Sequence, residues 1–307
     1  MASNRYENDT VCGVLPIFKE SGMTSHDVVG RIRRLYGTMR VGHTGTLDPM
    51  ARGVLVVLIG RAAKAAEFIS HERKHYVAGL RLGITTDTED ISGNVIKRSD
   101  VPHNIDIGAL CRQFTGMVMQ VPPMYSAIKI GGKKLVDLAR EGVTVERKPR
   151  PITVYSLGIE KCKDGTADYI LDVECSGGTY IRTLCADIGA AVGCGGCMSS
   201  LCRTENSGFT ERDCVTLAQL AEMTESERMH ALSDIETLFS DLPAVHLSDF
   251  FARLAADGNS LFQKKIGCTF EDGTRVRLCD ARGFFSLGEA RTADGEHVIK
   301  PIKKFRI

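Results

Sequence analysis

The sequence has no long apolar run. No stretch reaches the ~18 consecutive apolar residues that identify a membrane-spanning helix. Residues Met1 to Thr10 are polar and lack the hydrophobic centre of a signal peptide. Internal repeats and low-complexity segments are also missing from the sequence. These absences exclude a membrane-spanning protein and a repeat protein, and we expect a cytoplasmic globular protein.

The sequence also has little net charge, since 39 Lys and Arg face 38 Asp and Glu. The charges are nevertheless segregated along the chain. Residues 129–150 carry seven basic and three acidic side chains, whereas residues 211–241 carry eight acidic side chains and two arginines. Such segregation suits a protein that places one face against a polyanion. Ordinary solvated surface charge explains the pattern equally well, so charge alone leaves both interpretations open.

Eleven cysteines are present, at irregular spacing. A chain of this length without a secretion signal favours reduced thiols over disulfides. Cys194 and Cys197, with Cys202 nearby, could suggest zinc, but a structural zinc site takes four ligands, usually as two spaced pairs. The sequence offers no second pair of convincing spacing. We therefore expect no bound metal, and we assign these cysteines to a tight glycine loop and to the core.

Helical and strand-like segments mix along most of the chain without a regular strand–helix–strand alternation, which favours an α+β fold. Asp241-Leu-Pro243 has the composition of a linker. The residues after it predict one short helix and several short strands, with turns at Asp272-Gly273 and Asp294-Gly295. We therefore expect two domains, at residues 1–240 and 241–307.

The segment with the most chemical information is Gly42-His-Thr-Gly-Thr-Leu-Asp-Pro49, whose composition predicts a loop. Thr24 and Asp27 predict the start of a helix before this loop. Gly53 to Ile59 predicts a buried central strand after it. Asp48 is therefore held at the edge of a rigid scaffold, where it could act as a nucleophile, a base or a metal ligand. The residues alone do not choose among these roles.

Several motifs between about residues 11 and 210 resemble, in order and spacing, the TruB family of tRNA pseudouridine synthases. The resemblance implies the pseudouridine synthase fold, in which helices flank a mixed, largely antiparallel central sheet. It also implies a small C-terminal PUA-like β domain that binds RNA. The motifs are GMTSHD from Gly22, GHTGTLDPMARGVL from Gly42, KHYVAGLRLG around Tyr76, QVPPMYSAIKIGGKKL from Gln120, CSGGTYIRTLCADIG from Cys175 and LCRT from Leu201.

The resemblance assigns the chemistry to three residues. Asp48 matches the family's catalytic aspartate. Tyr76 matches the tyrosine that stacks on the target base and is placed to assist proton removal. Arg182 matches the arginine that pairs with the aspartate, and such a guanidinium would lower the pKa of the carboxyl and aim it. A cation in the first turn of a helix is poorly placed for the macrodipole, so a nearby anion such as Asp48 explains Arg182 better.

Four further residues match substrate-binding positions of the family. Tyr180 and Leu201 match residues that surround the flipped uridine. His43 matches a residue that fills the space left in the RNA loop and so helps extrusion. Lys19 matches a basic residue of the N-terminal signature. A histidine in such a loop is more often an ordinary loop residue. Its offset of five residues from Asp48 makes His43 a candidate substrate-binding residue.

The implied reaction converts a uridine in the T loop of tRNA, at position 55, to pseudouridine. The uracil is flipped out of the RNA, detaches at N1, rotates and rejoins through C5. Nothing is gained or lost overall, so we expect no cofactor. Asp48 would either attack C1′ of the ribose or remove the 2′ proton, and the sequence does not separate these two routes.

We expect the partner to be the T stem-loop of tRNA, bound by a monomer that needs no guide RNA and no protein partner. Two alternatives stay open. One is a non-catalytic RNA-binding or RNA-folding module, against which intact Asp48, Tyr76 and Arg182 argue. The other is a guide-RNA-dependent synthase of the same superfamily, against which the short tail argues.

Chelation tests the expected absence of a metal. Because Cys194 and Cys197 lack a second pair of ligands, EDTA should leave the rate of pseudouridine formation unchanged when the tRNA is folded beforehand. The measurement is that rate with and without EDTA, beside elemental analysis of the purified protein. Stoichiometric zinc that is lost together with activity would overturn the expectation.

Overall fold

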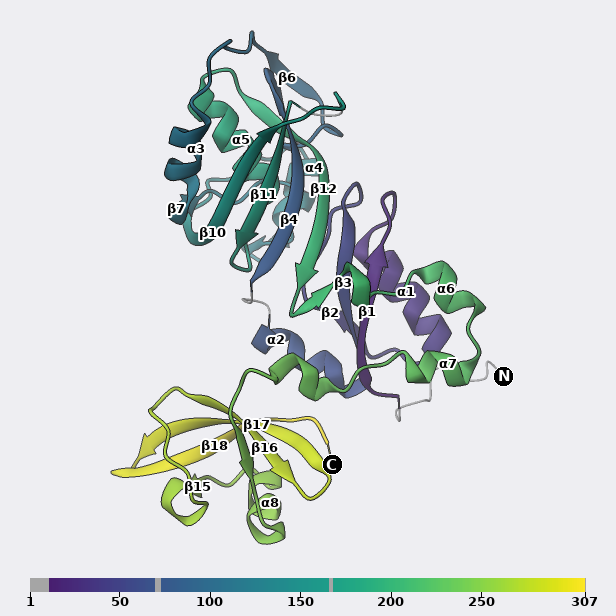
Figure 1. The fold of residues 1–307 in the computed structure, drawn as a ribbon, viewed down its shortest axis with the longest axis vertical. Coiled ribbons are helices and arrows are strands. Elements are labelled where there is room, and N and C mark those ends of the chain that lie inside the picture. The colour runs from purple at the N-terminus through teal and green to yellow at the C-terminus, as the bar shows by residue number, and fades with distance from the viewer. Residues whose placement is uncertain (1–10, 70–72, 166–167, 307) are drawn as a thin grey trace.

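The computed structural model describes residues 11–69, 73–165 and 168–306. Most of its strands belong to a nine-stranded sheet or to a five-stranded sheet, and two small hairpins stand apart. Figure 1 shows the large sheet in the upper and middle parts of the molecule and the five-stranded sheet, in yellow, at the lower end. The molecule is therefore elongated, with the large sheet above and the C-terminal part below.

The large sheet is mixed and mostly antiparallel, as expected. On its main path, among the described strands, only β12 and β3 pair in parallel. Gly53 of β3 has φ +110, and a Cβ there would lie 2.1 Å from the carbonyl oxygen of Arg203, so glycine is required for this close approach. The strand order is β1 (Gly13–Lys19), β3 (Arg52–Ile59), β12 (Gly196–Asn206), β4 (Lys74–Leu82), β11 (Tyr169–Cys175), β10 (Arg150–Lys161) and β7 (Gly116–Gln120).

Helices pack against the large sheet and share its main hydrophobic cluster. In Figure 1, α3 and α5 lie beside the upper strands, and α1 lies beside β1 and β3. The helix before the Asp48 loop begins, as predicted, at a capping box formed by Thr24 and Asp27. The longer helices of this part are α1 (Ser25–Tyr36), α3 (Ile107–Phe114) and α5 (Ile181–Val192).

The start of α5 differs from what the sequence predicts, because Thr179 follows the Ser176-Gly-Gly178 turn and precedes an apolar helical pattern, as an N-cap residue does. Thr179 fits the sequence pattern of a capping residue, but its hydroxyl donates to the Ser176 carbonyl, at 2.9 Å, and closes the preceding turn. Tyr180 is the N-cap residue and makes no side-chain capping bond. The prediction that Thr179 caps this helix is therefore wrong by one residue, and Arg182 lies in the first turn of α5.

β3 is buried on both faces, which explains its unbroken run of apolar residues. Leu55 and Val57 belong to the main cluster, whereas Val54 and Val56 belong to a second cluster on the other face. We call this second cluster the junction core, because the C-terminal sheet contributes to it. Its buried members are Val14, Val54, Val56, Leu58, Ala62, Ala65, Ile69, Ile235, Leu238, Phe239, Cys279, Phe284, Leu287 and Phe305.

The C-terminal part, after the expected linker, contains one helix of eight residues and a five-stranded sheet with a small cluster of its own. It is also fixed to the rest of the chain. The rings of Phe239, Phe284 and Phe305 pack at 5.6–5.8 Å between centroids, and Lys303 pairs with Glu67. Its elements are β14 (Ala244–His246), α8 (Asp249–Ala256), β15 (Leu261–Phe262), η4 (Gln263–Lys265), β16 (Arg275–Asp280), β17 (Gly283–Ala293) and β18 (Glu296–Lys304).

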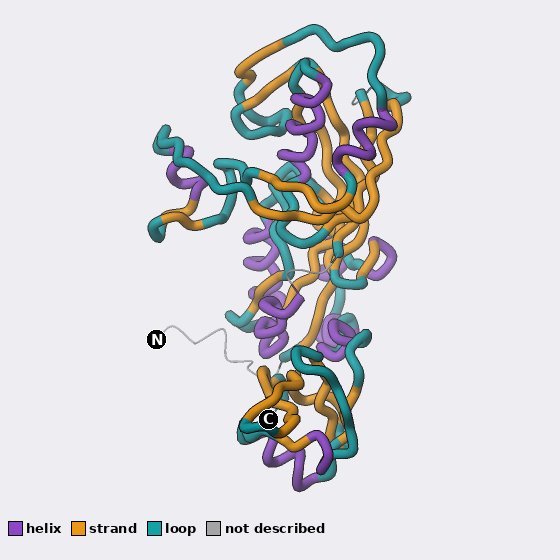
Figure 2. The backbone as a smooth tube through the Cα atoms, turned by 90° about the vertical axis from the view of Figure 1, so that its left-hand side faces the viewer, coloured by secondary structure: helices purple, strands orange, loops and turns teal. Residues whose placement is uncertain are grey.

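Short elements complete the fold. The short elements are β2 (Val41–His43), η1 (Gly60–Ala65), α2 (Ala66–Ile69), β5 (Ile84–Thr86), β6 (Val95–Arg98), β8 (Lys129–Ile130), β9 (Lys133–Lys134), α4 (Leu135–Arg140), β13 (Phe209–Thr210), η2 (Glu211–Asp213), α6 (Leu217–Glu222), α7 (Glu225–His230) and η3 (Ile235–Phe239). The segment that carries β8, β9 and α4 extends away from the large sheet, as Figure 2 shows.

Truncating an aromatic side chain tests the junction core. Phe305 is 4% exposed in this core, so Phe305→Ala should lower the free energy of unfolding by about 3–5 kcal/mol. Phe262, at 41% exposed, supplies the matched control, and Phe262→Ala should cost about 1 kcal/mol or less. Urea unfolding of both variants makes the comparison, and equal losses would show that the C-terminal part is not fixed through this cluster.

Candidate active site

A cleft of about 700 Å³ lies beside the loop that links β2 to β3. Residues of β4, β12 and α4 and the start of α5 form its other walls. Of the seven residues predicted to act in catalysis or substrate binding, the structure brings six together here, and Lys19 does not line the cleft. The six are His43, Asp48, Tyr76, Tyr180, Arg182 and Leu201.

The loop that carries Asp48 is anchored on both sides of this residue. Leu47 is 2% exposed and packs in the main cluster. The Ser25 hydroxyl accepts from the Leu47 amide at 2.8 Å and donates to the Leu47 carbonyl at 3.0 Å. The Pro49 carbonyl accepts from the Gly22 amide at 2.8 Å. The start of α1 and the residues before it therefore fix where the carboxylate emerges.

Arg182 is the direct partner of Asp48. Its Nε lies 2.9 Å from Oδ2 of Asp48, and its side chain is 6% exposed. The same guanidinium donates to the carbonyls of Thr88, at 3.0 Å, and Tyr125, at 2.9 Å. It also faces Oδ2 of Asp90 at 3.6 Å. Four groups from three segments thus orient one guanidinium, and the guanidinium in turn orients Asp48.

Asp90 is a member of this site that the sequence did not reveal. It is 5% exposed, and its Oδ1 accepts from the Thr88 hydroxyl at 3.0 Å and from the Ser92 amide at 2.9 Å. Those bonds leave Oδ2 toward Arg182. Residues 85–93 have the composition of an ordinary acidic turn, so nothing in the sequence separates Asp90 from its neighbours as a partner of Arg182.

The turn that carries Asp90 is also attached directly to α5. Glu89 has φ 63, in the left-handed region that non-glycine residues rarely adopt. Its carboxyl accepts from the Thr183 hydroxyl at 2.5 Å. Because Glu89 precedes Asp90 and Thr183 follows Arg182, this bond runs beside the ion pair and holds the same two segments together.

Burial raises the pKa of Asp48, and the charge of Arg182 opposes this shift without cancelling it. Asp90 raises the pKa of Asp48 further, because it is a second negative charge nearby. The expectation that Arg182 keeps the pKa of Asp48 low thus describes one contribution correctly and misses the larger one. Desolvation of a carboxylate favours its neutral form, and the pair orients Asp48 more than it acidifies it.

Tyr76 lies on β4 with 7% of its surface exposed. Burial raises the pKa of its hydroxyl, and Arg203 opposes the shift. Arg203 is 1% exposed, donates to the carbonyls of Val54, at 2.8 Å, and Gly45, at 3.0 Å, and lines the cleft. Arg203 falls in the LCRT motif, yet only Leu201 of that motif was predicted to act in the site.

The remaining cleft residues are positioned by backbone contacts. Gln120 of β7 accepts from the Tyr180 amide at 2.9 Å and donates to the Tyr180 carbonyl at 3.0 Å. Leu201 is 7% exposed on β12. Nδ1 of His43 accepts from the Gly45 amide at 3.2 Å, and burial lowers the pKa of the imidazole. His43 therefore lines the cleft as a neutral ring.

Lys19 serves the loop from outside the cleft. Its side chain is fully buried at 0% exposure, and its ammonium donates to the carbonyls of Met23, at 2.7 Å, Glu20, at 3.0 Å, and Pro49, at 3.4 Å. Burial lowers its pKa to about 8, and Asp48 opposes that shift. This geometry differs from direct contact with RNA, because the ammonium is already enclosed by carbonyls next to the Asp48 loop.

Comparison with known proteins identifies the family. A model described as TruB family pseudouridylate synthase (N terminal domain) matches residues 33–181, and one for the tRNA pseudouridylate synthase B C-terminal domain matches residues 182–240. A protein named tRNA pseudouridine synthase B from Heliobacterium modesticaldum is 41% identical over 95% of this chain and 95% of its own length. A protein of the same name from Alkaliphilus oremlandii is also 41% identical, over 96% of this chain and 98% of its own length. The chain belongs to the TruB family. It is an isomerase that converts uridine to pseudouridine in tRNA.

Solved structures agree with this TruB fold. One chain of the archaeal box H/ACA sRNP Nop10-Cbf5 complex superposes with a TM-score of 0.68 and 25% sequence identity, over 95% of this chain and 86% of that chain. A chain of an H/ACA RNP bound to a substrate RNA gives a TM-score of 0.69 at 24% identity, over 96% of this chain and 85% of that one. The pseudouridine synthase fold predicted from the sequence is confirmed.

Two kinds of feature are missing from the part of this TruB chain that the structure describes. Within residues 11–69, 73–165 and 168–306, no three His, Cys, Asp or Glu side chains are grouped as ligands of a metal ion. In the same ranges, no helix is both long enough and apolar enough to cross a membrane. Cys194 and Cys197 are buried free thiols, and the Cys194 thiol donates to the Gly195 carbonyl.

The raised pKa of Asp48 predicts an acidic limit to activity. An ionised carboxylate is needed as nucleophile or base, so kcat/KM should fall as the pH drops through a value above the ordinary 3.8 of an aspartate. The dependence of kcat/KM on pH reports the free enzyme, and tRNA affinity and circular dichroism over the same pH range control for binding and folding. A limit at or below 3.8 with intact binding would contradict the role of burial.

Proposed function

We propose that the enzyme acts on the T-loop uridine at position 55 of tRNA, flipped into the cleft and attacked by Asp48. The observation that carries this proposal is the ion pair of 2.9 Å between Asp48 and Arg182 at the wall of a 700 Å³ cleft. A base stacked in RNA cannot turn about its glycosidic bond, so the cleft must receive it extruded. The family comparison supports the same substrate class.

Both chemical routes use the same feature of the site. Attack on C1′ of the ribose and removal of the 2′ proton each need a carboxylate aimed at the sugar. Nε of Arg182 pairs with Oδ2 of Asp48, so the other oxygen would be the one that reacts. The Asp48 side chain is 32% exposed, so the carboxylate is accessible to a bound nucleotide while its partner is not.

Tyr76 would contact the flipped base, and His43 would fill the space that the base leaves in the RNA loop. The pKa of Tyr76 is raised by burial, so its hydroxyl stays protonated near neutral pH. The ring would stack on the uracil. Its protonated hydroxyl could take up the C5 proton only as a relay, accepting that proton while it releases its own to solvent in the cleft. The neutral His43 ring, with its Nδ1 already satisfied, suits insertion into the space vacated in the RNA loop.

Basic residues at the rim would hold the T stem-loop by its phosphates. Lys134 and Arg140, beside and within α4, line the cleft on the segment that extends from the large sheet. Phosphate contacts of this kind set the position of the RNA without reading its sequence. The PUA-like C-terminal part, residues 241–307, would add RNA contacts outside the cleft.

A monomer that works in the cytoplasm without a guide RNA or a protein partner fits the bacterial relatives, which are named as tRNA enzymes. The neighbours from H/ACA assemblies share the fold. A non-catalytic RNA-folding module is the second candidate. The geometry around the carboxylate argues against this candidate, because Asp48 is one of four partners that orient the buried Arg182 guanidinium.

Asp48→Asn tests the proposal, because it keeps the shape of the side chain and removes its charge. Pseudouridine formation at position 55 of an unmodified tRNA transcript should fall below detection while tRNA affinity stays within about threefold, a difference of ~0.7 kcal/mol. Asp100→Asn, at an exposed position outside the cleft, is the matched control and should behave like the unsubstituted enzyme. Turnover by Asp48→Asn near the control rate would sink the assignment.

A further inference from the structure

Glu89 occupies a backbone conformation that glutamate rarely adopts. Its φ of 63 lies in the left-handed region, which is free of strain for glycine and strained for most other residues. Asn and Asp are the usual exceptions, because their short side chains can bond to the local backbone. Glu89 lies in the turn between β5 and β6, directly before Asp90. A favourable contact made by the side chain must therefore offset the strain.

The carboxyl of Glu89 makes that contact with α5. The Thr183 hydroxyl donates to Oε2 of Glu89 at 2.5 Å, and Thr183 is 4% exposed. Thr183 follows Arg182 on the helix, just as Glu89 precedes Asp90 on the turn. Two neighbouring residues of the turn therefore contact two neighbouring residues of the helix. Two such contacts fix the orientation of the turn relative to α5, which a single contact would leave free.

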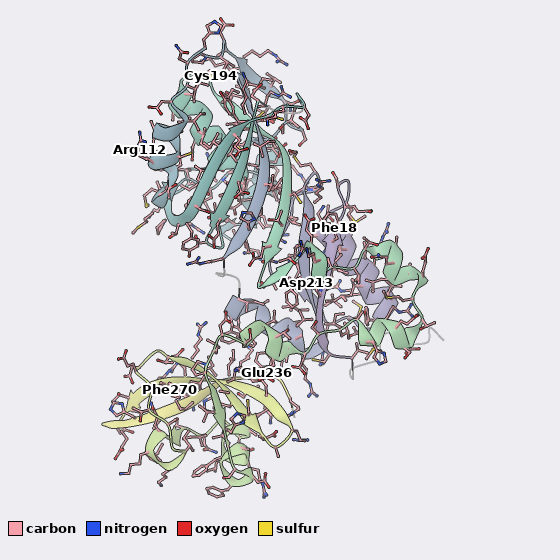
Figure 3. All side chains as sticks on the ribbon, viewed as in Figure 1. Phe18, Arg112, Cys194, Asp213, Glu236 and Phe270 are labelled. Atoms are coloured by element: carbon pink, nitrogen blue, oxygen red, sulfur yellow. The ribbon has the colours of Figure 1, made fainter. Side chains whose placement is uncertain are left out.

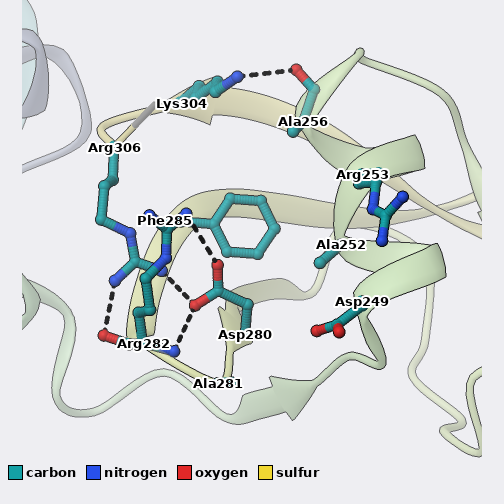
Figure 4. A pocket seen from close by; sticks show the side chains of 10 residues that line it. All are labelled: Asp249, Ala252, Arg253, Ala256, Asp280, Ala281, Arg282, Phe285, Lys304 and Arg306. Carbon is teal, nitrogen blue, oxygen red and sulfur yellow. Dashed lines mark hydrogen bonds and ion pairs between the residues drawn. The ribbon is translucent and has the colours of Figure 1, made fainter.

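Charge neutralisation does not explain the partner of Glu89. Glu236, labelled in Figure 3, pairs with an arginine, Arg277, at 2.5 Å. Asp280, shown in Figure 4, likewise pairs with Arg306. Glu89 has two arginines near enough to lower its pKa, yet its hydrogen bond is to a neutral hydroxyl. This bond therefore fixes a position and does not serve to neutralise a charge.

The Glu89–Thr183 bond is also independent of Arg182. In the part of the chain that the structure describes, the other polar contacts between this turn and α5 run through the Arg182 guanidinium, to the Thr88 carbonyl and to Asp90. Arginine has a long side chain with many rotamers, whereas threonine is short and branched at Cβ, so its hydroxyl has few positions. Thr183 can therefore set the distance between the turn and the helix, which the long Arg182 side chain cannot do alone.

The bond does not depend on the protonation of its surroundings. Burial raises the pKa of Glu89, and nearby charges act on that pKa in both directions. Asp187, one turn further along α5, faces Glu89 as well, and burial together with the charge of Glu89 raises its pKa to about 6. A carboxyl accepts from a hydroxyl whether or not it carries a proton. The charged groups around Glu89 are Arg182, Arg147, Asp90 and Asp187.

The turn is held on its other side by backbone bonds alone. Met198 of β12 donates its amide to the Glu89 carbonyl at 3.0 Å and accepts from the Ile91 amide at 2.8 Å. Any residue at position 89 would keep these bonds. If they are sufficient to place Asp90, the Glu89 side chain contributes only to the stability of the fold, and the rate of the reaction does not depend on it.

We propose that Glu89 is a positioning residue for the reaction: its bond to Thr183 keeps the turn where Asp90 can hold Arg182 against Asp48. This inference rests on the proposed function, because its effect on the rate passes through Asp48. Neither Glu89 nor Thr183 lines the cleft. The loss of their bond should therefore lower the rate of the chemical step and leave tRNA affinity nearly unchanged.

Two substitutions at position 89 and one at position 183 test the bond. Glu89→Gly removes the carboxyl and suits the left-handed backbone. Glu89→Gln removes the charge and keeps an oxygen that accepts from Thr183. Thr183→Val removes the hydroxyl from the other side with little change of shape. The matched control is Glu227→Gly, because Glu227 of α7 also accepts from a threonine hydroxyl, at 2.7 Å, and lies outside the cleft.

Single-turnover rates on an unmodified tRNA transcript, tRNA affinity and melting temperature are measured for each full-length variant. Glu89→Gly and Thr183→Val should each lower the rate about 10–100-fold, since a displacement of about 1 Å at a catalytic group can have such an effect. Their tRNA affinity should stay within about threefold, a difference of ~0.7 kcal/mol. Glu89→Gln should keep most of the activity, and Glu227→Gly should match the unsubstituted enzyme in rate.

The pH dependence of kcat/KM separates positioning from stability. Burial raises the pKa of Asp48, Arg182 and Lys19 oppose the rise, and the charge of Asp90 adds to it. A turn released from α5 takes Asp90 away from Asp48, so the acidic limit of Glu89→Gly and of Thr183→Val should shift to lower pH. The limit of Glu89→Gln should not shift. A residue that only stabilises the fold would lower the melting temperature and leave the limit in place.

Three results would overturn the proposal. These are an undiminished rate in Glu89→Gly and Thr183→Val, a lower rate without a shift of the acidic limit, and an equal loss in Glu89→Gln. The last result would assign the effect to the charge of Glu89 and not to its bond. Asp48→Asn in the same assay reports on the proposed function separately, because activity in that variant would refute the role of Asp48 whatever the Glu89 variants do.

Discussion

The guanidinium of Arg182 is the constraint on which the rest of the site depends. A buried cation is costly unless its donors are satisfied, and here Asp48, Asp90 and two carbonyls satisfy them. Those four acceptors lie on the Asp48 loop, on the turn after β5 and on the segment before β8. Since α5 places Arg182 among them, one side chain joins three otherwise separate segments at the wall of the cleft.

The arrangement around β3 makes this constraint possible. One face of β3 supports the main cluster under the Asp48 loop, and the other face carries the junction core and with it the C-terminal part. The Asp48 loop and the C-terminal part are therefore attached to opposite faces of the same strand. Because buried packing transmits position with little slack, the Asp48 carboxylate is held at a fixed position relative to the C-terminal part.

Motif and spacing were enough to predict the α+β fold and the residues that converge in the cleft. The pairing of Asp90 with Arg182 could not be predicted in this way. It depends on which carboxylate of the turn at residues 85–93 points toward Arg182, and the composition of the turn does not determine this. Lys19 was predicted from its motif as a contact for RNA, whereas burial beside Pro49 decides its environment. The packing of the C-terminal part was likewise not predicted, because the junction core joins residues far apart in the sequence, such as Val54 and Phe305.

A double-mutant cycle tests most directly whether Arg182 and its acidic turn act as one unit on Asp48. Single-turnover rates would be measured for Arg182→Lys, for Asp90→Asn and for the two changes together, each normalised to bound tRNA. Lysine keeps the charge and loses the planar fork that reaches all four acceptors. The account predicts that the double variant is about as slow as the slower single variant, since residues of one unit are not additive. Losses that multiply would contradict it.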